Sequence, residues 1–186
     1  MWNSNHPIMT VLIKTVLTLS FLLLLNRPLF SIPLIQLNDQ SEDVLLGTRM
    51  EYLEDHDKKW SIEDVSSTDF QNQFQPITQQ YPNFGKTDSA LWIRFRVENQ
   101  SKTNENWLLE LDNPFMTQID LYMTDQEGSF LHKHAGLNIS FHQREFPHRN
   151  YIFNHSIFKG KTRSYFMRLE TKNPMRFGLS IWSPNG

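Results

Sequence analysis

The sequence contains no cysteine. This absence excludes disulfide bonds, thiol catalysis, and zinc or iron–sulfur sites built on cysteine. It also excludes a lipid anchor attached through an N-terminal cysteine. Neither sign of charge predominates, because the 18 Lys and Arg residues nearly balance the 20 Asp and Glu residues, for a net charge of −2. Nucleic-acid binding needs a basic patch or stripe, so we expect no nucleic-acid partner.

Apolar runs of membrane length are also missing. The uncharged run at residues 15–25 is shorter than the roughly 20 residues that span a bilayer, and its length is typical of the apolar core of a signal peptide. Residues 1–31 are therefore predicted to be a signal peptide that directs export to the periplasm, with cleavage before Ile32. A retained N-terminal membrane anchor is the alternative, because residues 29–37 are again mostly apolar.

Strand patterns fill the rest of the chain, and residues 91–99 carry the clearest one. There Ile93, Phe95 and Val97 alternate with Trp92, Arg94 and Arg96. A period of two with β-branched and aromatic residues is typical of a half-buried strand. Six further strands are predicted, at residues 107–112, 118–123, 130–135, 150–154, 164–170 and 177–182. Before them, the polar segment at residues 32–44 is expected to be loosely ordered, and Ser61 followed by Asp64 predicts a short helical turn. Short strands separated by turn residues predict that residues 32–186 form a single all-β domain, an antiparallel sandwich or barrel.

The polar and aromatic faces of these strands form the candidate binding surface. If these faces share one sheet, the candidate ligand-binding residues are Trp92, Arg94, Glu110, Tyr122 and Arg168. Aromatic rings stack on sugar rings, while an Arg fork and a carboxylate hold carboxylates or hydroxyls. Trp92 and Arg94 are expected at the centre, since the opposite face of their strand already supplies the core. The alternative is a cross-strand ladder in which the arginines pair with Glu110, Asp120 and Glu170.

No constellation predicts catalysis or a cofactor. His132 and His134 share a strand face, but no third ligand stands at a telling spacing, so we predict surface histidines and no metal site. The acidic residues at 51–57 fit no calcium-loop spacing. Nothing in the sequence places Glu110 and Glu170 at the separation that glycoside hydrolysis needs. Catalytic motifs are absent as well, and we therefore predict a protein that is not an enzyme.

Several short segments occur in a distinctive order. They are YLED at 52–55, WSIED at 60–64, LWIRF at 91–95, WLLEL at 107–111, IDLY at 119–122 and YFMRL at 165–169. In this order and spacing, over residues 44–183, the sequence resembles the type 2 extracellular domain of the bacterial 7TM-DISM receptors, the seven-transmembrane receptors with diverse intracellular signalling modules. The resemblance implies a periplasmic jelly-roll β-sandwich, similar to carbohydrate-binding modules, that senses a small polar or carbohydrate-like ligand.

The resemblance also implies partners. In such receptors the domain precedes seven membrane helices and a cytoplasmic output module, whereas this sequence ends at Gly186. We expect a truncated or stand-alone module whose signalling half is a membrane receptor or another signalling protein. A structural or adaptor sandwich that binds another envelope protein is the alternative function. A concave cleft lined by Trp92, Arg94, Tyr122 and Arg168 would favour the sensor, and a flat apolar patch would favour the adaptor.

Overall fold

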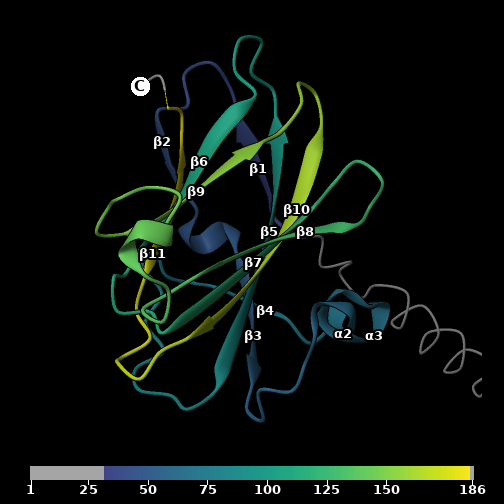
Figure 1. The fold of residues 1–186 in the computed structure, drawn as a ribbon. Helices are drawn as coiled ribbons and strands as arrows, with labels where there is room; N and C mark the ends of the chain where they lie inside the picture. Colours follow the sequence, from purple (N-terminus) through teal and green to yellow (C-terminus); the bar gives the residue numbers. More distant parts are fainter. Residues whose placement is uncertain (1–31, 185–186) are drawn as a thin grey trace, which may run out of the picture. The chain divides into compact units, whose positions relative to one another are not determined.

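The computed structural model describes residues 32–184, and the predicted signal segment lies outside these residues. They form two β-sheets (Figure 1). Sheet A contains, in spatial order, β4 (Gln75–Pro76), β3 (Glu51–Asp55), β5 (Ala90–Asn99), β10 (Thr162–Glu170), β7 (Gln118–Thr124) and β8 (Phe130–Ala135). Sheet B contains β2 (Asp43–Leu45), β11 (Gly178–Trp182), β6 (Asn106–Asp112) and β9 (Tyr151–Ser156). These pairs are all antiparallel, so the prediction of an all-β sandwich is confirmed.

The seven strands predicted from residue 91 onward all occur, with bounds within two residues of the expected ones. The segment before them is different from expectation. Residues 32–44 were expected to be a loosely ordered lead-in, but they contain β1 (Leu34–Leu37), which pairs in parallel with the end of β5. Ile35 and Leu37 are fully buried there. The prediction of loose order is therefore wrong, because two alternating apolar side chains suffice to dock a short strand on a sheet.

The main core lies between the two sheets. Ile93, Phe95 and Val97 are fully buried in it, as their alternation predicts. The Phe95 ring stacks on that of Tyr165 at a centroid distance of 4.8 Å, and Trp107 enters the same core from sheet B. Apolar burial of this kind is the dominant favourable contribution to folding. The inner faces are thus fully used by packing, which leaves the outer faces and the sheet edges for function.

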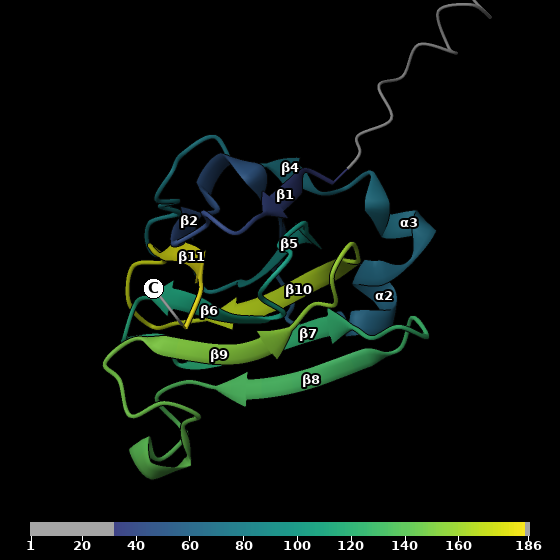
Figure 2. The same ribbon diagram turned by 90° about the horizontal axis from the view of Figure 1, so that it is seen from above.

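A second, smaller core covers the outer face of sheet A. Two short helices, α2 (Ile62–Ser66) and α3 (Thr68–Gln71), follow β3, and Figure 2 shows α2 beside β10 and β7. The predicted helical turn is confirmed, since Ser61 and Asp64 form a complete capping box. The apolar residues of this core are Leu53, Ile62, Val65, Phe74, Trp92 and Phe166.

The loop at residues 136–150 joins β8 to β9, the edge strands of sheets A and B. It contains one turn of 3-10 helix, η2 (Phe141–Gln143). The loop begins at Gly136, whose φ of 137° favours glycine and whose α-carbon faces the Thr117 carbonyl closely. Among residues 32–184, none of the helices is long and apolar enough to cross a membrane.

Candidate functional site

The strand register gathers four of the five predicted ligand-binding residues on the outer face of sheet A. Trp92 of β5 stands opposite Arg168 of β10, and Arg94 stands opposite Phe166, which faces Tyr122 of β7. Directly paired residues point to the same face of a sheet. The fifth residue, Glu110, lies on β6 in sheet B, so the structure does not bring it to the other four.

Trp92 and Arg94 are covered by the chain itself. Their exposed fractions are 1% and 2%. The Arg94 Nε donates a hydrogen bond to Glu51 at 2.7 Å, and its Nη2 donates one to the Gln71 carbonyl at 2.9 Å. The guanidinium carbon lies 4.0 Å from the centre of the Phe74 ring. Neither residue therefore presents surface to a ligand, and Arg94 fits the predicted alternative of an ion pair across strands, although with Glu51 as its partner.

Arg168 is partly buried and also paired. Its Nη1 lies 2.6 Å from Glu170 Oε1, and Lys58 approaches the other oxygen of Glu170 at 2.9 Å. Burial would raise the pKa of Glu170, but the hydrogen bonds from Lys58 and Arg168 outweigh it and lower the pKa. Arg168 is thus ion-paired, but with Glu170 of its own strand β10 and not across strands as the ladder alternative predicts.

Tyr122 sits in a row of rings. It stacks on Trp92 at 5.9 Å between centroids and on His132 of β8 at 4.5 Å. His132 Nε2 lies 3.0 Å, and His134 Nδ1 2.7 Å, from the same carboxylate oxygen of Asp120. Asp120 is the third group that the sequence reasoning missed, because it lies on the neighbouring strand β7 and only the pairing of β7 with β8 brings it close.

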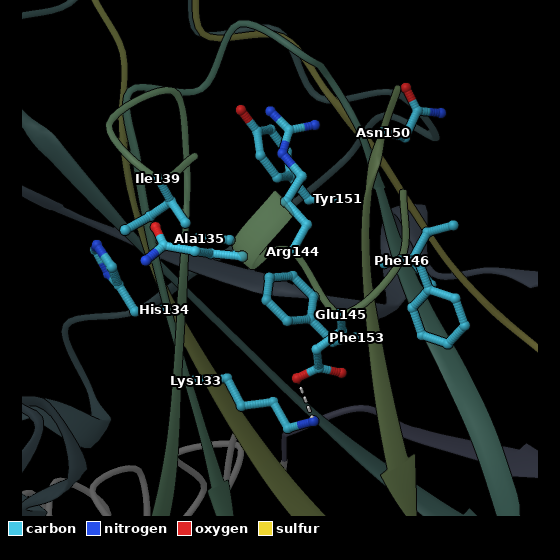
Figure 3. A pocket seen from close by; sticks show the side chains of 12 residues that line it. Lys133, His134, Ala135, Ile139, Arg144, Glu145, Phe146, Asn150, Tyr151 and Phe153 are labelled. Atoms are coloured by element: carbon cyan, nitrogen blue, oxygen red, sulfur yellow. Dashed lines mark hydrogen bonds and ion pairs between the residues drawn. The ribbon is translucent and has the colours of Figure 1, made fainter. Parts of the chain in front are cut away.

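A pocket of about 160 Å³ lies between the edge strands β8 and β9 under the loop at residues 136–150 (Figure 3). An ion pair of 2.6 Å joins Lys133 of β8 to Glu145 of the loop. Both side chains also bind β9, because Lys133 Nζ donates to the Asn154 carbonyl at 2.5 Å and Glu145 accepts the Asn154 N–H at 2.8 Å. The pocket therefore has a polar, charged wall held between two rigid strands.

Further polar side chains complete the lining, namely His134, Gln143, Arg144 and Asn150. The Arg144 guanidinium lies 4.6 Å over the ring of Tyr151, within the range of a cation–π contact. Two polar atoms that are buried here, Arg144 Nε and Asn150 Oδ1, have no hydrogen-bond partner in the described part of the chain. Asn150 is fixed by its amide nitrogen, which donates to Glu110 at 2.7 Å. Sequence reasoning missed this site because it followed strand faces, whereas the lining comes largely from a loop.

The acidic residues at 51–57 make local contacts. Glu51 is bound to Arg94, Glu54 accepts a hydrogen bond from Thr87, and Asp55 accepts the backbone N–H groups that follow β3. Among the described residues, Asp120, His132 and His134 form the group that could hold a metal ion. The acidic residues at 51–57 thus serve the local structure.

A family model for the 7TMR-DISM extracellular 2 domain matches residues 47–183. Comparison with curated proteins finds no match. The matched region begins at η1 (Gly47–Arg49), ends just after β11, and so takes in both candidate regions described above, the outer face of sheet A and the β8–β9 pocket. The prediction of this family from the order of short segments is confirmed. The chain belongs to the 7TMR-DISM extracellular 2 family, the extracellular sensor domains of seven-transmembrane receptors.

Proposed function

We propose that this domain senses a small polar or carbohydrate-like ligand by binding it in the pocket between β8 and β9. The observation that supports the proposal is the pair of unpartnered atoms in the lining, the donor Nε of Arg144 and the acceptor Oδ1 of Asn150. A buried polar group without a partner costs about 1–3 kcal/mol. A ligand that offers both an acceptor and a donor removes that cost when it binds.

The lining chemistry sets the ligand class. Arg144 and Lys133 provide cations for a carboxylate, while Glu145 and Asn150 accept hydrogen bonds from hydroxyls. The volume of about 160 Å³ is below the roughly 300–1,000 Å³ of pockets for drug-sized molecules. The pocket therefore suits a small hydroxy acid, or one unit of a larger saccharide.

A larger hollow of about 450 Å³ lies beside β4, lined by residues of β3 and of the segment 75–84. Its lining includes Tyr52, Ile77 and Phe84 but no charged side chain. Recognition of a small polar molecule needs a few convergent polar groups in a desolvated site. This hollow lacks the charged groups that the β8–β9 pocket has, so the smaller pocket is the better candidate.

The residues predicted from the strand faces have other parts in this proposal. Glu110 positions Asn150 through the hydrogen bond of 2.7 Å, so it acts on the site indirectly. Arg94 and Trp92 hold α2, α3 and the following turn onto sheet A. Tyr122 and Arg168 stay on the partly exposed outer face. Only Glu110 is thus connected to the proposed pocket.

A thermal-shift screen of sugars and small hydroxy acids on the purified chain, followed by titration calorimetry, tests the proposal. Arg144→Gln should weaken the binding of a screened ligand at least tenfold, which corresponds to about 1.4 kcal/mol. Arg149→Gln is the matched control, since Arg149 is exposed on the same loop and does not line the pocket. Equal affinity in the wild type and Arg144→Gln would refute the site, and equal losses in both variants would indicate an effect of charge alone.

A further inference from the structure

A second set of ligating side chains lies on the outer face of β7 and β8. Asp120, His132 and His134 have ligand atoms that all lie within 4.8 Å of one another, as found among residues 32–184. We propose that these three residues bind a divalent transition metal ion such as Zn²⁺. The inference goes beyond the proposed function, because the ion would be held on the outer face of sheet A, although one of its ligands, His134, also lines the β8–β9 pocket.

The strands themselves assemble the set. His132 and His134 are two positions apart on β8 and therefore point to the same face. Asp120 on β7 is the direct partner of His134 in the antiparallel pair. Sites built on strands hold their ligands more firmly than sites built on loops. The three side chains thus converge without any movement of the backbone.

The distances are close to those of a metal site. The two ring nitrogens lie 3.0 Å and 2.7 Å from one oxygen of Asp120. Zinc bonds to nitrogen and oxygen of about 2.0–2.2 Å place the ligand atoms of a tetrahedral site roughly 3.4 Å apart. The His132 and His134 nitrogens would have to move away from the Asp120 oxygen by about 0.4 Å and 0.7 Å, through rotations about the side-chain bonds, to make room for the ion.

Neighbouring groups orient the ligands. Gln118 Nε2 donates to the other oxygen of Asp120 at 2.6 Å, which leaves the first oxygen to face the two rings. The His132 ring is stacked on Tyr122 with only 10° between the planes. Outer contacts of this kind fix ligand orientation and raise metal affinity.

The donor set and its exposure specify the metal. Two imidazoles with one carboxylate suit Zn²⁺ and its first-row neighbours, whereas Ca²⁺ and Mg²⁺ prefer oxygen ligands. The His132 and His134 side chains are 46% and 38% exposed, so a fourth position opens to solvent. Arg168 faces Asp120 from β10 but is ion-paired with Glu170, and Glu63 of α2 adds negative charge near Tyr122.

Titration calorimetry of the purified chain with ZnCl₂ tests the inference. The wild type should bind one ion per chain at the site, and His132→Gln and His134→Gln should each weaken that binding at least tenfold. His142→Gln is the matched control, because His142 is an exposed histidine on the loop at residues 136–150 and lies outside the cluster. Its affinity should equal that of the wild type. Both ligating rings are at the surface, so their loss leaves the fold intact.

The visible absorption of bound Co²⁺ gives an independent test of the metal site. Co²⁺ bound by nitrogen and oxygen ligands in a tetrahedral site gives visible absorption bands, which should appear with the wild type and disappear with His134→Gln. Failure of the wild type to bind Zn²⁺ in a one-to-one ratio would overturn the inference. So would Zn²⁺ affinity in His132→Gln and His134→Gln equal to that of the wild type. Because these titrations contain no pocket ligand, their failure leaves the proposed sensing function untouched.

Discussion

The buried ion pair between Arg94 and Glu51 should dominate the stability of the outer face of sheet A. Both side chains are almost fully buried, at 2% and 3% exposed, and their charged atoms lie 2.7 Å apart. The change Arg94→Ala leaves the Glu51 carboxylate buried without its cation. Removing one partner of a buried pair costs about 3–5 kcal/mol. Since a whole domain is stable by only about 5–15 kcal/mol, we expect a large drop in the urea midpoint.

The loss should reach beyond the pair. Arg94 also donates to the Gln71 carbonyl at the end of α3 and covers the ring of Phe74. Arg94→Ala should therefore loosen the segment at residues 61–76, and limited proteolysis should cut there first. Arg96→Ala is the control, because Arg96 is on the same face of β5 and only half buried. A change of at most about 1 kcal/mol is expected for it.

The double variant Arg94→Met with Glu51→Leu separates a pair from two independent residues. Replacing both charges by apolar side chains removes the unpaired carboxylate, and such replacements are often neutral or stabilising. The double variant should be more stable than Arg94→Met alone or Glu51→Leu alone. Urea unfolding followed by tryptophan fluorescence measures the stability of all three variants. A loss below about 1 kcal/mol in Arg94→Ala, or losses that simply add in the double variant, would refute the reasoning. Weaker ligand binding by a stable Arg94→Ala would restore Arg94 to the ligand site.

Three further outcomes follow from the geometry. Burial lowers the pKa of His155 from 6.5 to about 3, so between pH 7 and pH 5 this histidine becomes protonated in the unfolded chain but stays neutral in the folded chain. The unfolding free energy should therefore fall by about 2 kcal/mol from pH 7 to pH 5, and urea titrations of His155→Gln should show a smaller fall. A β-carbon at Gly136 would lie 2.4 Å from the Thr117 carbonyl oxygen, so Gly136→Ala should cost more than Gly128→Ala, where the space is open. If the signal segment is exported and cleaved as predicted, intact mass of the periplasmic protein should show a chain that begins at Ile32.

Strand positions were predictable because one physical rule acts on every strand alike. A strand buried on one face alternates apolar and polar side chains, and the run at Ile93, Phe95 and Val97 reports that burial directly. The same rule gives no information on which sheet a strand joins. Glu110 and Arg168 therefore look alike in sequence, although they lie on different sheets.

The sequence also leaves open what covers the outer face of sheet A. The alternation shows that Trp92 needs an apolar partner outside the core, and either a ligand ring or part of the chain meets that need. The structure supplies Ile62 and Val65 of α2. Helices as short as α2 and α3 have no stripe that sequence periodicity can detect. In the same way, the position of Asp120 beside two histidines depends on the register of β7 and β8, which alternation alone leaves open.

The free edge of β9 explains why the pocket lies where it does. Edge strands expose unpaired backbone groups and are commonly protected by charged side chains or a covering loop. Lys133 and Glu145 do this here, since both bind the backbone of Asn154 on β9 and so close the gap between the sheets. Protection of the edge accounts for this ion pair but requires nothing of Arg144 Nε or Asn150 Oδ1, which stay unpartnered in the same lining. The part of the pocket that folding does not need is the part available to a ligand.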